Sequence, residues 1–183
     1  MLMLAKHKLF VSCHHDIDQV YQDNLENLLE NRRDVQVSKS PRIGEVGQII
    51  QPEPLYKTIR DDYLGDTNVT VVLIGAETWK RRHVDWEIGA SIQQTVFTPR
   101  SGLLGVLLPT YNFPSPNQYD TYTIPPRLQF NIQCGFASIH MWSDDPDSIY
   151  AWLEEAFRRR IGLEPDNSYP SFTEDRIEET WQV

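Results

Sequence analysis

The sequence predicts an α/β fold in which a five-stranded, mostly parallel sheet lies between two layers of helices. Two runs, residues 69–75 and 103–108, are almost wholly apolar and rich in branched side chains, which is typical of strands buried on both faces. Segments with apolar residues at helical spacing separate these and the other strand-like runs. Strands that alternate with helices favour a parallel sheet with right-handed crossovers, and therefore a three-layer sandwich.

The amino-terminal part is expected to supply the first two strands and the first helix. Residues 8–12 form a short apolar run that predicts a central first strand. Apolar residues then recur at helical spacing from Ile17 to about Glu30, and Asp16 is placed to cap this helix. Val35 and Val37 alternate with polar residues and indicate a weaker second strand.

The middle of the chain is expected to supply the second and third helices around the third strand. Residues 38–48 contain proline and glycine and predict a loop. Pro54 suits a helix start, and this helix should end near Gly65. After the third strand, 69–75, a short polar loop leads into a helix whose apolar stripe is Val84, Ile88 and Ile92.

The carboxyl-terminal part completes the alternation. Residues 103–108 predict the fourth strand, and residues 109–126 contain five prolines and predict a long loop, a kind of segment that is often functional. Residues 136–142 predict a last, edge strand. A final helix should begin at Asp144-Asp145-Pro146 and end at Gly162.

The length of 183 residues suits one domain with an extension. We assign residues 1–162 to the domain and residues 163–183 to a carboxyl-terminal extension, which is polar, acidic and without clear periodicity. The pattern leaves open whether this extension packs on the domain or frays.

Composition excludes several classes of protein. The formal net charge of −9 argues against a general surface for nucleic acid or anionic membrane. Cys13 and Cys134 form no CxxC pair, so structural zinc is not expected. No run of about 18 apolar residues predicts a membrane span, and the first residues are too short a run for a signal peptide. The expected location is the cytoplasm, with both thiols reduced.

The predicted strand order, 2-1-3-4-5, opens a crevice between the first and third strands. It would bring the loop of residues 12–16 beside the loop of residues 75–83 and Glu87, which lies one turn into the following helix. A carboxylate there could stabilise the positive charge that develops at a sugar carbon as a glycosidic bond breaks. The alternative is an ordinary helix glutamate, solvated or paired with a nearby arginine.

Polar residues of the first loop are candidates to line this crevice: Ser12, Cys13, His14 and His15. The alternative is a surface loop with one buried histidine. Adjacent residues rarely reach one metal ion together, and consecutive residues diverge too much to form a catalytic triad, so neither a metal site nor a triad is expected.

Basic and aromatic residues flank the other loop. Arg81 and Arg82 could pair with a pyrophosphate, or could simply be surface residues. Trp79 and Trp86 could form an aromatic wall for a base, or could pack in the core. The chain contains no GxGxxG and no Walker-type motif, so a nucleotide here would not be held by the usual glycine-rich loops.

Together these residues resemble the TIR-like domain of the Thoeris antiphage ThsB family, over roughly residues 6–160. The first part of the resemblance is Phe10, Ser12, His14 and Asp16. The second part runs from Asn68 through Gly75, Thr78, Arg81, Arg82, Val84, Trp86, Glu87 and Ile88, and its stretch from Val72 to Ile88 is the most specific. The segment from Ile124 through Arg127 to Leu128 is also similar to that group.

The resemblance implies a flavodoxin-like TIR fold and an enzyme that cleaves the nicotinamide–ribose bond of NAD, with Glu87 as the catalytic residue. NAD would be the substrate, and no bound cofactor is expected. The product would be a cyclic ADP-ribose isomer or a related conjugate that activates a separate effector when a phage is sensed, with a phage protein as a possible trigger. Relatives often carry tryptophan where this chain has His83, one turn before Glu87. The loop 38–48 is the expected place for a contact between subunits.

Two other functions remain open at this stage. A TIR-like interaction module without catalysis would assemble with other TIR domains through its loops. A nucleoside deoxyribosyltransferase-like enzyme also uses a glutamate on a similar fold, but its substrates carry no pyrophosphate for Arg81 and Arg82 to bind.

Overall fold

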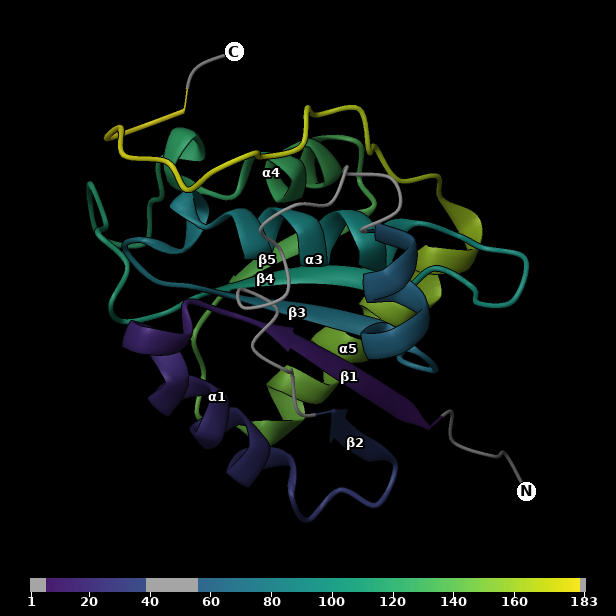
Figure 1. Ribbon diagram of the computed structural model, residues 1–183. Helices are drawn as coiled ribbons and strands as arrows, with labels where there is room; N and C mark the ends of the chain where they lie inside the picture. The colour runs from purple at the N-terminus through teal and green to yellow at the C-terminus, as the bar shows by residue number, and fades with distance from the viewer. Residues whose placement is uncertain (1–5, 39–55, 182–183) are drawn as a thin grey trace.

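The computed structural model describes residues 6–38 and 56–181. Five strands form one sheet in the order β2-β1-β3-β4-β5, and each neighbouring pair is parallel (Figure 1). This confirms the predicted fold class and strand order. The strands are β1 (His7–Ser12), β2 (Val35–Ser38), β3 (Val69–Ile74), β4 (Gly102–Leu107) and β5 (Ala137–Met141).

Helices cover both faces of the sheet and give the three predicted layers (Figure 1). On one face, α1 (His15–Leu29) and α5 (Pro146–Gly162) pack on the strands through side chains such as Leu25 and Leu153. On the other face lie α3 (Arg82–Ile92), α4 (Pro126–Gln133) and the π-helical turn η2 (Ile59–Leu64). Burial of the apolar side chains on both faces stabilises the sandwich.

The central strands match the sequence pattern that predicts them. Every residue of β3 and of β4 is buried, as expected for parallel strands with helices on both sides. At Gly102 the backbone carbonyl of Ala156 in α5 lies so close that a Cβ would overlap it. The glycine therefore lets α5 pack directly on the first residue of β4.

Two local predictions, the cap of the first helix and the extent of the long loop, need correction. Others concern residues that the structure does not describe. Helix α1 begins at His15 with His14 as its N-cap, so Asp16 lies in the first turn instead of capping it. The long loop predicted for 109–126 is followed at once by α4, which the sequence analysis missed; it is a short helix begun by Pro126. Pro54 and residues 39–48 lie outside the described ranges, so the helix start and the proposed subunit contact there stay predictions.

The carboxyl-terminal extension packs on the domain, which answers the question the sequence left open. It crosses the outer sides of α3 and α4, away from the sheet (Figure 1). Phe172 and Trp181 are 3% and 5% exposed. The Trp86 indole donates to the Phe172 carbonyl at 2.8 Å, and the Trp181 indole donates to the Ile124 carbonyl at 2.7 Å. The domain boundary at residue 162 stays a prediction.

Across residues 6–38 and 56–181, no helix combines the length and the apolarity that crossing a bilayer requires.

Candidate functional site

The Glu87 carboxyl lies at the meeting point of β1 and α3. Its Oε2 accepts a hydrogen bond from the hydroxyl of Ser12, the last residue of β1. Its Oε1 has no hydrogen-bond partner among the described residues, and the side chain has 0% exposure. No lysine or arginine of the described residues pairs with it. Among the described residues, Glu87 is thus neither solvated nor paired with an arginine, which are the two forms of the ordinary alternative.

Burial raises the pKa of Glu87 to about 8, and the hydrogen bond from Ser12 opposes that rise only in part. A carboxyl group with this pKa is about nine-tenths protonated at pH 7. With the site buried as it is in this structure, the Glu87 side chain is therefore mostly neutral. A positive charge placed beside it would favour its ionised form.

His83 joins the two loops one helical turn before Glu87. Its Nε2 lies 3.0 Å from the carbonyl oxygen of Cys13, to which it donates. Its ring stacks on that of His15, with centroids 5.5 Å apart and planes 18° apart. Burial lowers the pKa of His83, which favours the neutral ring. The loop after β1 and the head of α3 therefore meet above Glu87, at the edge where the sequence places the crevice.

Cys13 and His14 are both buried in the first loop. The Cys13 thiol donates to Gln22 Oε1 at 3.5 Å, and burial, then the charge of Glu87, raises its pKa to about 12, so it is not a thiolate at neutral pH. His14 is 6% exposed, and neither of its ring nitrogens has a hydrogen-bond partner among the described residues. Burial, then the charge of Arg81, lowers the pKa of His14 and keeps it neutral.

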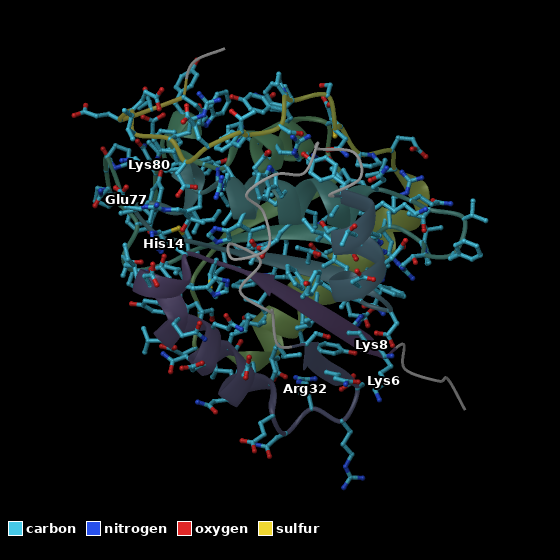
Figure 2. The ribbon with its side chains drawn as sticks, viewed as in Figure 1. Lys6, Lys8, His14, Arg32, Glu77 and Lys80 are labelled. Carbon is cyan, nitrogen blue, oxygen red and sulfur yellow. The ribbon has the colours of Figure 1, made fainter. Side chains whose placement is uncertain are left out.

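Titratable side chains lie at both ends of the parallel strands. His14, Glu77 and Lys80 lie at one end, whereas Lys6, Lys8 and Arg32 lie at the opposite end (Figure 2). Lys80 pairs with Glu77 at 2.9 Å. Its charge is therefore already partly neutralised by a neighbour from the same loop.

Arg81 and Arg82, the candidate phosphate ligands, both meet Asp175 of the extension. Arg81 Nη1 lies 3.0 Å from one Asp175 oxygen, and the Arg82 backbone N–H donates to the other at 2.9 Å. The Arg82 guanidinium lies over the Trp86 ring, 5.3 Å from its centroid. A carboxylate of this chain therefore occupies the position predicted for an anionic ligand, a contact that the sequence does not reveal.

The two tryptophans have different surroundings. Trp86 is 5% exposed and packs with Phe10, Tyr56 and the η2 turn, as a core residue does. Trp79 is 2% exposed and borders a hollow of about 360 Å³ that Tyr111 and Glu179 also line. The residues that line this hollow come from the segments after β3 and β4 and from the extension.

Comparison with known families now adds to this geometry. A family model described as "Thoeris protein ThsB, TIR-like domain" matches residues 10–112. The chain belongs to this family. It is therefore a TIR-like protein of antiphage defence. No curated protein matches the chain.

The part of the chain that matches the ThsB TIR-like family runs from β1 to just after β4 and includes Ser12, His83 and Glu87. It ends before α4 and the extension, so neither Arg127 nor Asp175 lies within it. Within residues 6–38 and 56–181, no three histidine, cysteine, aspartate or glutamate side chains gather in a way that could hold a metal ion.

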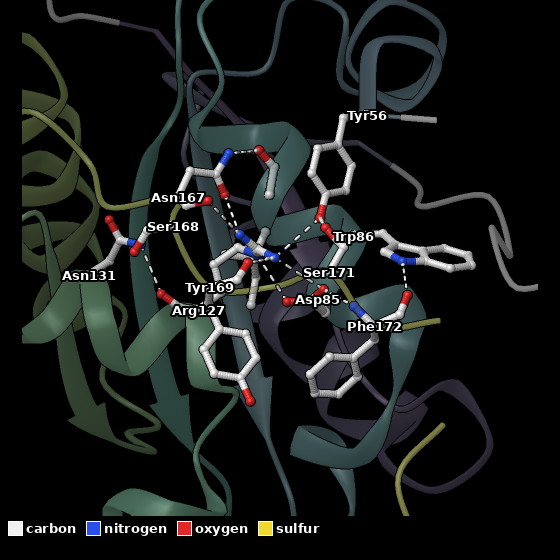
Figure 3. A network of polar contacts seen from close by, with 12 residues as sticks. Tyr56, Asp85, Trp86, Arg127, Asn131, Asn167, Ser168, Tyr169, Ser171 and Phe172 are labelled. Atoms are coloured by element: carbon white, nitrogen blue, oxygen red, sulfur yellow. Dashed lines mark hydrogen bonds and ion pairs between the residues drawn. The ribbon is translucent and has the colours of Figure 1, made fainter. Parts of the chain in front are cut away.

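Arg127 is the main polar residue that the sequence analysis did not assign to a role. It is 1% exposed and pairs with Asp85, which is 2% exposed, at 3.0 Å between Nε and Oδ1 (Figure 3). Its other donors reach the Asn167 side chain at 2.6 Å and the Tyr169 carbonyl at 2.8 Å. The guanidinium thus fastens α3, α4 and the extension together. A buried arginine of this kind gives no periodic signal in the sequence.

Asp18 is a second buried polar residue that the sequence does not single out. Its carboxylate accepts from the Thr110 hydroxyl at 2.9 Å and lies against Gly75, where a Cβ would overlap it. Asp18 is 1% exposed. It links the starts of the loops after β1, β3 and β4, and so supports the edge of the sheet on which Glu87 depends.

Proposed function

We propose that this chain cleaves the bond between nicotinamide and ribose in NAD, with Glu87 as the catalytic carboxylate. The observation that carries the proposal is the environment of Glu87. It is a buried carboxyl with no cationic partner in residues 6–38 and 56–181, and Ser12 holds it where the first and third strands end. Membership of the ThsB TIR-like family supports the same reaction.

Cleavage of the nicotinamide–ribose bond is favoured by a negative charge beside the sugar. As the nicotinamide leaves, positive charge develops on the ribose carbon, and an ionised carboxylate nearby stabilises it. Ser12 holds one oxygen of Glu87 and leaves the other oxygen without a partner to meet the ribose. NAD itself brings a positive ring, which would lower the pKa of Glu87 on binding and so supply the ionised form.

Substrate must reach a side chain that has no exposed surface. We propose that it enters between the loop of residues 13–15 and the head of α3, where His83 donates to Cys13 and stacks on His15. We propose that these contacts separate when NAD enters. His83 and His15 would then flank the substrate, while the neutral Cys13 thiol takes no part as a nucleophile.

The group that attacks the ribose decides the product. Water gives ADP-ribose, a nucleophile from the same molecule gives a cyclic ADP-ribose isomer, and a second bound molecule gives a conjugate. We propose a cyclic or conjugated product that activates a separate effector in the cytoplasm after phage infection.

A TIR-like module without catalysis is the second candidate, and the complete enclosure of Glu87 favours it. In that case the carboxyl would be a buried, protonated core residue. The two candidates differ in whether nicotinamide is released by the wild-type protein under the conditions of infection.

The test uses purified protein with NAD, with and without lysate from phage-infected cells, and measures nicotinamide by chromatography. Glu87→Gln keeps the shape and removes the charge, and we expect nicotinamide release to fall at least a hundredfold. Glu155→Gln makes the same change on the outer face of α5, where the side chain is 58% exposed, and should leave release unchanged. Equal release by wild type and Glu87→Gln would remove Glu87 from the reaction, and no release by wild type with infected lysate would favour the module.

A further inference from the structure

The carboxyl-terminal extension is fixed at two buried aromatic residues, Phe172 and Trp181. The Phe172 carbonyl accepts from the Trp86 indole at 2.8 Å, and the Trp181 indole donates to the Ile124 carbonyl at 2.7 Å. Between these points runs a mostly exposed segment, residues 173–180, which we call the arch. The arch is therefore tethered at both ends.

The arch itself is loosely packed. A hollow of about 260 Å³ is lined by residues 171–178, and Ile177 is 91% exposed. The arch touches the domain through the Arg176 amide, which donates to the Lys80 carbonyl at 2.8 Å, and through Asp175. A segment with few buried contacts can leave the surface at little cost in free energy.

Asp175 lies at the head of α3. It accepts from the Arg82 backbone N–H at 2.9 Å and pairs with Arg81 at 3.0 Å, while its own side chain stays 43% exposed. Free N–H groups at a helix start and an arginine fork both favour an anion, and a phosphate uses the same donors as a carboxylate. Asp175 is thus an anion of this chain at a position that suits a phosphate.

The same place lies beside the Glu87 site. His83, the next residue of α3, donates to Cys13 at 3.0 Å. His14 is 6% exposed, has no hydrogen-bond partner for either ring nitrogen among the described residues, and lies near enough to Arg81 that this charge lowers its pKa. A neutral histidine ring carries one N–H donor, so the loop beside Arg81 holds a buried donor with no partner in the described residues.

We propose that the arch is an autoinhibitory contact: Asp175 occupies the anion position at the head of α3, and a pyrophosphate-bearing ligand replaces it and releases the arch. The identification of that ligand as NAD rests on the proposed function. The displacement of Asp175 by pyrophosphate does not depend on catalysis.

The first experiment measures release of the arch directly. Trypsin can cut after Arg176, and the rate of this cut in the full chain, followed by mass spectrometry, reports how often the arch leaves the domain. Asp175→Asn should raise the rate roughly threefold or more over Glu174→Gln, which removes a charge from the exposed neighbour without a hydrogen bond or ion pair in the described residues. Each rate is divided by that of the free peptide 168–183 with the same substitution, because charges beside the bond affect trypsin itself.

The second arm adds inorganic pyrophosphate. In the wild-type chain the normalised rate should rise with pyrophosphate and saturate. In Asp175→Asn the normalised cleavage rate should be high without pyrophosphate and should change little when pyrophosphate is added. Arg81→Gln, which leaves the sequence around the cut intact, should also cut quickly and lose the response to pyrophosphate.

The outcomes separate the two proposals. Equal normalised rates for Asp175→Asn and Glu174→Gln, or a wild-type rate that pyrophosphate leaves unchanged or lowers, would overturn the arch as a displaceable contact. If nicotinamide release is measurable, Asp175→Asn should release more at low NAD than Glu174→Gln, and equal release would overturn autoinhibition. If no variant releases nicotinamide while pyrophosphate still frees the arch, the proposed function fails and the displacement stands.

Discussion

Replacing Glu87 with glutamine should stabilise the protein at neutral and alkaline pH and leave its stability nearly unchanged near pH 4.5. The folded chain keeps the Glu87 proton up to a pKa of about 8, whereas the unfolded chain releases it above its ordinary value of 4.5. Between these values the folded state binds more protons than the unfolded state. The contribution of Glu87 to the free energy of unfolding therefore falls as pH rises and becomes constant above about pH 8.

The size of the effect follows from the distance between the two pKa values. Each pH unit is worth about 1.4 kcal/mol, so the contribution changes by about 5 kcal/mol in all and by about 3 kcal/mol between pH 4.5 and pH 7. Glutamine has no proton to lose and can still accept the Ser12 hydrogen bond. At pH 7 the variant should therefore unfold at a temperature roughly 6–12 °C above the wild type.

Thermal unfolding followed by circular dichroism from pH 4.5 to pH 8.5 measures this difference. Titrations that both proteins share cancel in the comparison, and Glu155→Gln serves as the control, with a profile parallel to the wild type. The reasoning would be refuted if wild type and Glu87→Gln gave parallel profiles. Such a result would mean that the Glu87 carboxyl is ionised and hydrated in the folded protein.

Three other substitutions test the packing that surrounds the site. Ser12→Ala should cost about 1–3 kcal/mol in urea unfolding at pH 6, because it removes the hydrogen-bond partner of the buried Glu87 carboxyl. Arg127→Met should cost about 3–5 kcal/mol, because Asp85 is left buried without its cation, and a smaller loss in the double variant with Asp85→Asn would identify the ion pair as the cause. Gly102→Ala should cost at least about 1 kcal/mol, since its Cβ would overlap the backbone of α5, and a stability equal to wild type would contradict that close approach.

The fold could be predicted from the sequence because its signals are local and periodic. The run 69–75 is apolar at five of the six buried positions of β3, Thr70 being the exception, and the helical stripe from Val84 identifies α3. Strand order then follows from the topology expected of alternating strands and helices, and it brings Ser12 and Glu87 together. Helix α4 was not predicted because it is short and follows a proline-rich loop. Its eight residues make about two helical turns, too few for a clear periodic pattern of apolar residues.

The depth of Glu87 and the contacts of the two arginines could not be predicted, because both depend on residues far away in the chain. Glu87 is enclosed because Ser12 and the loop after β1 cover it. Arg81 pairs with Asp175, which lies 94 residues further along the chain in a segment whose composition predicts no structure. Periodicity reports which face of an element is buried, and it carries no information about which polar group will meet another from a distant segment.

Enclosure and charge are linked in this site. While the loop of residues 13–15 lies against His83, Glu87 is buried and its neutral form is favoured. Any movement that lets water or a cation reach it lowers its pKa, so opening and ionisation assist each other. A rise of pH toward 8 therefore weakens the closed state, and a cationic substrate does the same at constant pH. Under the proposed reaction, the carboxylate would become charged when the substrate that needs it arrives.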